Sequence, residues 1–315
     1  MGSPQTMNDG ADVISMLSAP TNLGLRPPAL GSVPGTAKAP EALREAGLYA
    51  RLTELGGAID AGTLLPGRYV ADHDPSSGRL RNEEAIVDYA LRLADRIGHI
   101  LSSGHAPLVI GGDCSVLVGA GLALARRGRH GLVHVDGHTD FRHPGNSDAC
   151  ASLAGEDLAS VVGLHWPSVA DIEGRAPYIA LEDVVHVGCR DDDQHLDEVR
   201  RLVAGTITSS QVLRDGAFAT AARAQSVMTR AEVRGYWLHV DVDVLDPAHL
   251  SAVDSPSPGG LAPNDLVELL AALAPEAVGA QVTVFDPDLD PDGTQAALLT
   301  DVLIAGLSGL GSRWK

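Results

Sequence analysis

Short apolar runs that alternate with helical patterns are the feature that most restricts the fold of this chain of 315 residues. Six apolar runs are predicted as strands, at 13–17, 108–110, 132–135, 184–187, 237–240 and 282–285. Helical periodicity predicts helices at 40–55, 82–103, 116–127, 195–204, 215–230, 263–274 and 294–306. Nearly continuous apolar strands separated by helices are typical of a parallel sheet covered on both faces. The pattern therefore predicts an α/β fold.

Ligands of such folds gather where the strands end, and two segments place polar residues there. Asp136, His138 and Asp140 follow the apolar run at 132–135, and Asp241 and Asp243 end the run at 237–240. Alternate residues of extended backbone share one side, so each segment directs its side chains toward one place. These residues are the first candidates for a functional site.

Two interpretations of these residues compete. A single aspartate after a strand usually caps the next helix. Four carboxylates near one point repel one another, by about 4 kcal/mol per pair at about 4 Å and an effective dielectric constant of about 20. Such a group must bind protons or cations, and carboxylates with an imidazole suit Mn, Fe or Zn better than Ca or Mg. Two ions would neutralise the group and supply hydroxide at neutral pH.

A third segment, at 108–115, has an apolar strand, a glycine pair and the polar residues Asp113, Cys114 and Ser115. A phosphate-binding turn is one interpretation of this arrangement. The segment lacks the lysine of a P-loop, and its glycine spacing does not fit a dinucleotide-binding fold. Alone, it indicates no particular ligand.

Composition excludes several classes of protein. The chain has 23 basic and 41 acidic residues and a net charge of −18, which argues against nucleic acid as a partner. Three cysteines form no disulfide framework. The N-terminal residues lack the basic and apolar regions of a signal peptide, and no apolar run reaches the length of about 18 residues that a transmembrane helix needs. We expect a cytoplasmic protein with no membrane partner.

Domain organisation is predicted to be simple. The 35 glycines and 19 prolines are spread along the chain, with no block that resembles a linker and no internal repeat. Residues 1–10 are predicted to be a disordered N-terminus, and residues 11–315 to form a single domain.

Taken together, the three polar segments resemble the ureohydrolases: arginases, agmatinases and formiminoglutamases. The family pattern GGDHS, DAHxD and DxDxxDP appears here as GGDCS at 111–115, DGHTD at 136–140 and DVDVLDP at 241–247. Further similarity lies at 19–28, 40–48, 189–193 and 258–261. The resemblance covers roughly residues 13 to 310.

The resemblance implies a three-layer α/β/α fold with an eight-stranded parallel sheet, and a centre of two manganese ions per chain. Such enzymes hydrolyse C–N bonds of guanidino or formimino groups in small molecules with hydroxide held between the metals. By matching positions, the implied metal ligands are Cys114, Asp136, His138, Asp140, Asp241 and Asp243. Asp136 and Asp241 would bridge the ions, and Asp140 would also orient the hydroxide as the catalytic residue. Asp246 would orient the loop. Family members are often trimers or hexamers, so a homo-oligomer is implied.

Cys114 is the first departure from the family pattern, because it stands where the family has a histidine. One interpretation is a thiolate ligand, which the metal would hold deprotonated and which would alter the metal preference. The alternative is a small buried residue beside a metal site that is weak or lost. Cys150 and Cys189 are interpreted as ordinary buried or loop cysteines.

Two further departures concern catalysis. Ala154 takes the position of a histidine that arginases carry after the metal motif, and His143 or His165 is either a substitute proton shuttle or a surface residue. Val284 replaces a glutamate that binds the guanidinium in the family, and the nearby Asp286 is not assigned that role.

Two residues are candidates for substrate binding. Asp193 matches a position that meets the substrate's α-ammonium in arginases, and it is equally interpreted as an acid at a helix start. Arg142 resembles the arginine of formiminoglutamases, and either pairs with a substrate carboxylate or faces solvent.

The sequence therefore predicts a manganese-dependent hydrolase of small linear guanidino or amidine compounds, releasing urea, ammonia or a related product. A formiminoglutamase-type hydrolase is the alternative that Arg142 favours. A catalytically impaired metal-binding relative is the alternative that Cys114, Ala154 and Val284 favour.

Overall fold

The computed structural model describes residues 13–71, 73, 77–230 and 232–314. The predicted disordered segment 1–10 lies outside these residues. In the described part of the chain, no helix has the length and apolar character needed to cross a membrane.

One eight-stranded parallel sheet forms the centre of the fold, in the order β2-β1-β3-β8-β7-β4-β5-β6. The strands are β1 (Ile14–Ala19), β2 (Ala58–Thr63), β3 (Ala106–Gly111), β4 (Gly131–Val135), β5 (Val184–Val187), β6 (Gly205–Ile207), β7 (Tyr236–Asp241) and β8 (Ala277–Thr283). The predicted α/β class and the eight parallel strands implied by the resemblance are confirmed.

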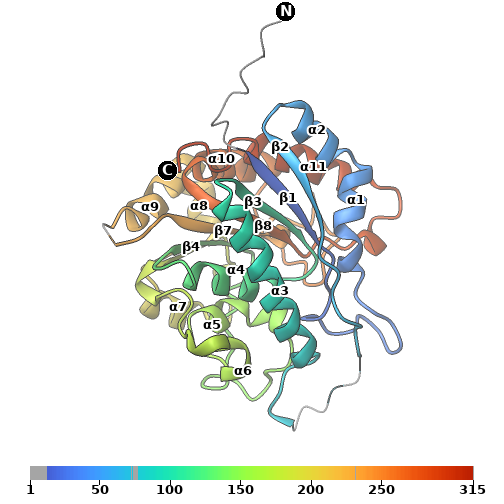
Figure 1. Cartoon of the computed structure of the whole chain (residues 1–315), viewed down its shortest axis with the longest axis vertical. Coiled ribbons are helices and arrows are strands. Elements are labelled where there is room, and N and C mark those ends of the chain that lie inside the picture. The colour runs from blue at the N-terminus through green and yellow to red at the C-terminus, as the bar shows by residue number, and fades with distance from the viewer. Residues whose placement is uncertain (1–12, 72, 74–76, 231, 315) are drawn as a thin grey trace, which may run out of the picture.

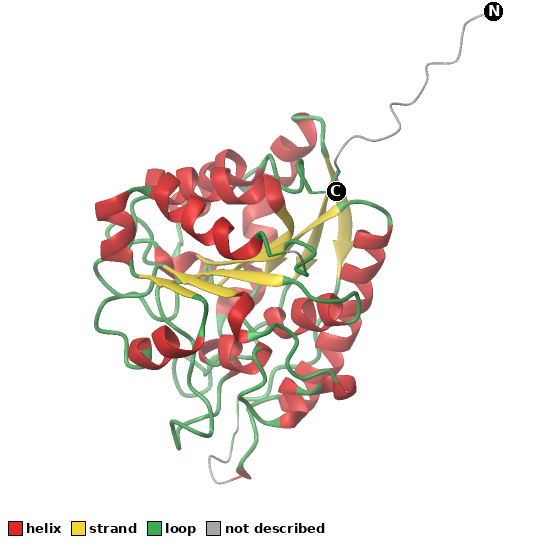
Figure 2. Cartoon of the chain, turned by 90° about the vertical axis from the view of Figure 1, so that its left-hand side faces the viewer, coloured by secondary structure: helices red, strands yellow, loops and turns green. Residues whose placement is uncertain are grey.

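Helices cover both faces of the sheet (Figures 1 and 2). They are α1 (Ala39–Glu45), α2 (Leu48–Glu54), α3 (Glu83–Ser102), α4 (Val116–Ala125), α5 (Asp157–Val161), α6 (Pro167–Ala170), α7 (Leu196–Leu202), α8 (Ser209–Asp215), α9 (Ala217–Met228), α10 (Pro263–Leu273) and α11 (Thr294–Leu307). Short 3-10 turns connect several of them.

Alternation along the strands divides the core into two layers. Leu108 and Ile110 of β3 pack in the layer that contains residues of α1, α2 and α8–α11. Val109, between them, packs in the layer that contains residues of α3–α7. Side chains of successive strand residues point to opposite faces, so a strand buried on both faces needs a continuous apolar run. This is why the central strands are visible in the sequence.

Differences from the predicted elements have local causes. The predicted helix 40–55 is divided into α1 and α2 at Gly47, which adopts a left-handed φ of 94°. The predicted helix 215–230 covers only α9, because Gly216 separates it from α8. The strands β2 and β6 were not predicted, and they are the two edges of the sheet. β2 is largely exposed and β6 has 3 residues, so neither has a long apolar run.

Candidate metal centre

Three of the four central strands of the sheet carry the three motifs to one edge. β3, β8, β7 and β4 lie side by side and parallel, so their carboxyl ends meet. Cys114 lies between β3 and α4, Asp136 follows β4 directly, and Asp241 is the last residue of β7. Asp243 lies in the 3-10 turn Val242–Val244 that follows. Parallel topology thus gathers side chains that are more than a hundred residues apart.

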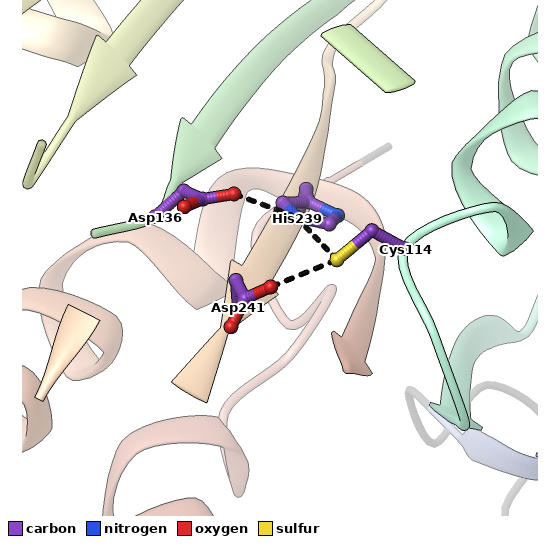
Figure 3. A group of neighbouring side chains, drawn as sticks. All are labelled: Cys114, Asp136, His239 and Asp241. Carbon is purple, nitrogen blue, oxygen red and sulfur yellow. Dashed lines mark hydrogen bonds and ion pairs between the residues drawn. The ribbon is translucent and has the colours of Figure 1, made fainter. Parts of the chain in front are cut away.

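The deeper half of the site contains Cys114, Asp136, His239 and Asp241, whose side chains point toward one another in Figure 3. Their donor atoms all lie within 4.8 Å of one another, and all four residues are buried. The Cys114 thiol donates to Asp241 Oδ2 at 2.8 Å. His239 Nε2 lies 3.8 Å from Asp136 Oδ2 and 3.9 Å from Cys114 Sγ. We call this group the thiol half-site.

The outer half contains Asp136, His138 and Asp243, with donor atoms again within 4.8 Å of one another. His138 Nδ1 and Asp243 Oδ2 are 2.9 Å apart. The backbone N–H of Gly137 donates to Asp243 Oδ1 at 3.0 Å, and the N–H of His138 donates to Asp136 Oδ1 at 2.7 Å. We call this group the imidazole half-site. Asp136 belongs to both half-sites.

Protonation differs between the two halves. Burial works against the charged His138 imidazolium, but the hydrogen bond to Asp243 and its charge outweigh burial and raise the pKa of His138 to about 10. The pKa of Asp243 is lowered, because the contact with His138 and the Gly137 N–H outweigh its burial. The outer pair is therefore ionic in the metal-free protein.

The carboxyls deeper in the site favour their protonated forms. Burial raises the pKa of Asp136 and Asp241 well above the usual range, and the charge of Asp243 adds to both shifts. Burial followed by the charge of Asp241 raises the pKa of the Cys114 thiol in the same way. A divalent cation would replace these protons.

The donor set fits a pair of divalent metal ions. Carboxylates, two imidazoles and one thiol combine hard and borderline ligands, as transition metals prefer. Among the described residues, Asp136 Oδ2 is buried without a hydrogen-bond partner, so a shared carboxylate has a free ligand atom at the junction of the two halves. Of the six ligands that the resemblance implies, five lie in these two half-sites: Cys114, Asp136, His138, Asp241 and Asp243.

Asp140 lies beside this group without joining either half-site. It lines a cavity of about 360 Å³ next to His138, Asp241 and Asp243. Burial and the charge of Asp136 raise its pKa well above the usual range. Its φ of 45° is unusual for a residue with a side chain, and such backbone conformations concentrate at functional sites.

Both proposed substrate contacts lie at this cavity. Asp193 accepts hydrogen bonds from the Thr139 N–H at 3.0 Å and from the Thr139 hydroxyl at 2.6 Å. It also accepts the N–H of His195 at 2.9 Å, just before α7, so both interpretations of Asp193 have a structural basis. Arg142 donates through Nε to Glu156 Oε1 at 3.1 Å, which fixes its side chain at the cavity wall.

Ala154 and Val284, which replace catalytic residues of the family pattern, both line the cavity. Val284 has a φ of 76°, an outlier for a β-branched residue, and its N–H donates to Gly112 O at 2.7 Å. Neither side chain offers a proton or a charge to a substrate. Asp286 instead accepts the Gly35 N–H at 3.0 Å and does not line this cavity.

The surface interpretation of His143 and His165 is wrong, since both residues are buried. His165 Nε2 lies 2.9 Å from Glu156 Oε2, and His143 Nε2 lies 3.4 Å from Glu198 Oε1. Neither lines the cavity, whereas His195 does. Cys150 and Cys189 are buried free thiols, as expected.

Comparison with known proteins agrees with this architecture. The model of the Arginase family matches residues 14–308. The chain belongs to the arginase family.

Individual relatives show the extent of the similarity. An arginase of Bacillus caldovelox is 29% identical over 303 residues, which cover 94% of this chain and 98% of that protein. An arginase of Agrobacterium fabrum is 30% identical over 303 residues, covering 91% and 88%. The solved structure of the Bacillus caldovelox arginase superposes with a TM-score of 0.83 at 28% identity, covering 95% and 98%.

Sequence reasoning missed several residues of this arginase-family site. Asp157 and His239 are fully buried beside Asp136, and Glu156 is fully buried beneath Arg142. Arg190 donates to the carbonyl groups of Asp243 and Ser257, which ties two loops of the site together. The one available signal was a polar residue within an apolar strand, which His239 gives at the centre of WLHVD.

Asp246 has the loop-orienting role that the sequence predicted for it. Its Oδ2 accepts the Gly259 N–H at 2.7 Å and the Gly260 N–H at 3.2 Å, and its Oδ1 accepts the Ala248 N–H at 2.9 Å. Because it holds the turn at 258–261 without entering the metal centre, it is suited to serve as a control residue.

Proposed function

We propose that this protein is a binuclear metal hydrolase, with manganese as the expected ion, that cleaves a C–N bond of a small linear guanidino or amidine compound. The observation that carries the proposal is the junction at Asp136, which is shared by the thiol and imidazole half-sites. The six proposed ligands are Cys114, Asp136, His138, Asp140, Asp241 and Asp243. When bound, two divalent ions would supply hydroxide at neutral pH and polarise the substrate.

The chain's own residues would position the reaction. Asp140 borders both the ligand group and the cavity, so its carboxylate would accept a hydrogen bond from the attacking oxygen and direct it toward the amidine carbon. Asp193 would face a cationic end of the substrate. Its existing bonds to Thr139 fix the carboxylate, so little conformational freedom is lost when a substrate binds.

Substrate choice is expected to differ from that of arginases, because Ala154 and Val284 leave the cavity without two polar groups of the family pattern. Arg142 favours a substrate that carries a carboxylate, since its guanidinium borders the cavity and Glu156 fixes its Nε side. A formiminoglutamase-type hydrolase is therefore the second candidate function. A catalytically impaired metal-binding relative is the third, favoured by the replacements at 114, 154 and 284.

Two measurements test the proposal. Metal analysis after loading with Mn²⁺ is expected to give close to two ions per chain, and none would refute the metal centre. A substrate panel of arginine, agmatine, formiminoglutamate, guanidinobutyrate and hydroxyarginine, assayed for urea, ammonia and formamide, is expected to show turnover of an amidine other than arginine. Metal binding without turnover on any of these compounds would favour the impaired relative.

The domain organisation, the oligomeric state and the cellular location of the protein are also part of the proposal. A single domain at 11–315, a trimer or hexamer of identical chains and a cytoplasmic location follow from the sequence and the family resemblance. Light scattering coupled to size-exclusion chromatography would test the oligomer, and a monomer would refute that part.

A further inference from the structure

A row of buried polar side chains crosses the sheet next to the thiol half-site. His239 of β7 pairs in register with Gln281 of β8, and Trp237 lies two residues earlier on β7. All three residues are fully buried, so their polar atoms must be satisfied by one another or by the site. The direction of each hydrogen bond in this row can be determined.

Trp237 sets the direction, because an indole N–H can only donate. It donates to Gln281 Oε1 at 3.0 Å. This contact fixes the amide, and therefore the NH2 group of Gln281 faces His239 Nδ1 at 2.7 Å. An amide NH2 also only donates, so His239 Nδ1 accepts and carries no proton. The remaining proton of the imidazole is on Nε2.

Nε2 is the atom that faces the metal centre (Figure 3). It lies 3.9 Å from Cys114 Sγ, 3.8 Å from Asp136 Oδ2 and 3.9 Å from Asp157 Oδ2. All of these neighbours are acceptors when ionised, and both carboxylate oxygens lack a hydrogen-bond partner among the described residues. An N–H at this position faces three groups that accept a hydrogen bond once they are ionised.

A metal-binding imidazole needs the opposite arrangement. Its ligating nitrogen offers a lone pair, and its other nitrogen donates an N–H to an acceptor. In His239, Nδ1 faces the N–H donor of Gln281, so the imidazole proton is on Nε2. Yet Nε2 is close enough to Cys114 and Asp136 to share an ion with them. Position alone would make His239 a ligand, and hydrogen-bond direction excludes it.

We propose that Trp237 and Gln281 hold His239 as a fixed N–H donor, so that His239 is a positioning residue and Cys114 is the ligand of the thiol half-site. The inference rests on the proposed function for the identity of that site. The chain of donors runs from Trp237 through Gln281 and His239 to Cys114 Sγ. The His239 N–H stabilises the sulfur and the carboxylates beside it when they are ionised.

The most direct test reverses the direction of the chain. In the Gln281→Glu variant, a carboxylate of the same shape accepts from both Trp237 and His239, which moves the imidazole proton to Nδ1. Two-bond proton–nitrogen NMR spectra identify the protonated nitrogen in metal-free and Zn²⁺-loaded protein. We expect Nε2 to be protonated in the natural protein in both states, and Nδ1 in the variant. Gln211→Glu, on a distant helix cap, is the matched control with an unchanged His239.

A second pair of variants tests the inference even if the protein does not fold with a buried glutamate at position 281. His239→Gln keeps an N–H donor, whereas His239→Leu has none. Removal of a residue that supports a ligand typically lowers metal affinity about 10- to 100-fold, so we expect this loss for the leucine variant and a smaller one for glutamine. Both variants should bind two Co²⁺ ions at saturation and keep the thiolate-to-cobalt absorption band, which Cys114→Ser should abolish.

The outcomes separate this inference from the proposed function. A Zn²⁺-loaded protein with an unprotonated, metal-shifted His239 Nε2 would overturn the inference and leave the metal hydrolase intact. Loss of one Co²⁺ ion in His239→Gln would do the same. If the natural protein binds no metal, the proposed function fails together with the assignment of Cys114 as a ligand. The assignment of His239 as a fixed N–H donor is then decided separately, by the nitrogen that carries its proton.

Discussion

The two halves of the metal centre share Asp136 but differ in the thiol that only one of them contains and in where their protons lie. The imidazole half-site borders the cavity and holds an ionic His138–Asp243 pair. The thiol half-site is buried, and its proton lies between Cys114 and Asp241. A cation entering the first meets an existing carboxylate, whereas a cation entering the second must displace the proton that the Cys114 thiol shares with Asp241. The two half-sites are therefore expected to bind metal with different affinity and with different pH dependence.

Loss of the shared residue is expected to have the largest effect. Asp136→Asn removes a donor from both half-sites, so metal content should fall from two ions per chain to near zero. Turnover on the best substrate of the panel should fall by about a thousandfold or more, because electrostatic stabilisation in such sites is worth about that factor. Metal analysis and steady-state kinetics measure both effects.

Asp246→Asn is the control for that variant, since Asp246 holds the turn at 258–261 and does not enter the metal centre. It should keep two ions. If Asp136→Asn also kept both, the shared-ligand arrangement would be wrong.

Removal of the thiol should affect one half only. Cys114→Ser is expected to weaken the binding of one ion by about 10- to 100-fold and leave the other unchanged, because a neutral hydroxyl replaces a thiolate ligand. Competition titration with a chromophoric chelator would resolve the two affinities. Equal weakening of both ions would contradict the separation of the half-sites. Cys114→His, which restores the family's residue, should recover tight binding of two ions.

The imidazole half-site should show the clearer pH dependence. A metal ion must displace the proton of His138, whose pKa is raised to about 10, so affinity should rise about tenfold per pH unit below that value for this proton. The plot of log affinity against pH should lose about one unit of slope in His138→Gln. An unchanged slope would show that His138 does not lose a proton on metal binding.

The metal-free protein should show the opposite trend in stability. The folded pKa of His138 is above its ordinary value of 6.5, so the His138–Asp243 pair stabilises the fold fully below about pH 6.5. That contribution is lost as pH rises through about 10. Thermal melting of metal-free natural protein and His138→Gln between pH 6 and pH 10 would show their difference narrowing. A constant difference would contradict the assignment.

The smallest effect is expected at the cavity wall, where neither half-site is altered. Arg142→Lys keeps the charge but loses the planar donor group, so KM for a carboxylate-bearing substrate should rise by about tenfold with little change in kcat. Arg175→Lys, an exposed ion pair with Glu173, is the matched control. If KM rises only for substrates that carry a carboxylate, Arg142 binds that carboxylate. If KM is unchanged for all substrates, this role of Arg142 is refuted.

Much of this molecule follows from its sequence alone. Central strands such as β3 and β4 need apolar residues on both faces, so their positions are visible as short runs. The polar residues that end those runs predicted the place of the site, because carboxyl ends of parallel strands meet at one edge. The edge strands β2 and β6 escaped prediction because an edge strand need not be apolar on both faces.

Only the tertiary structure decided how the site is divided and which neighbours act on it. Sequence spacing placed Asp136, Asp241 and Asp243 at one edge, but it did not show that Asp136 belongs to two groups of donors. It gave no role to His239, because the partners that set its proton lie on β7 and the neighbouring strand β8. The direction of a hydrogen bond depends on a chain of contacts between residues distant in sequence, and such contacts exist only after the sheet has formed.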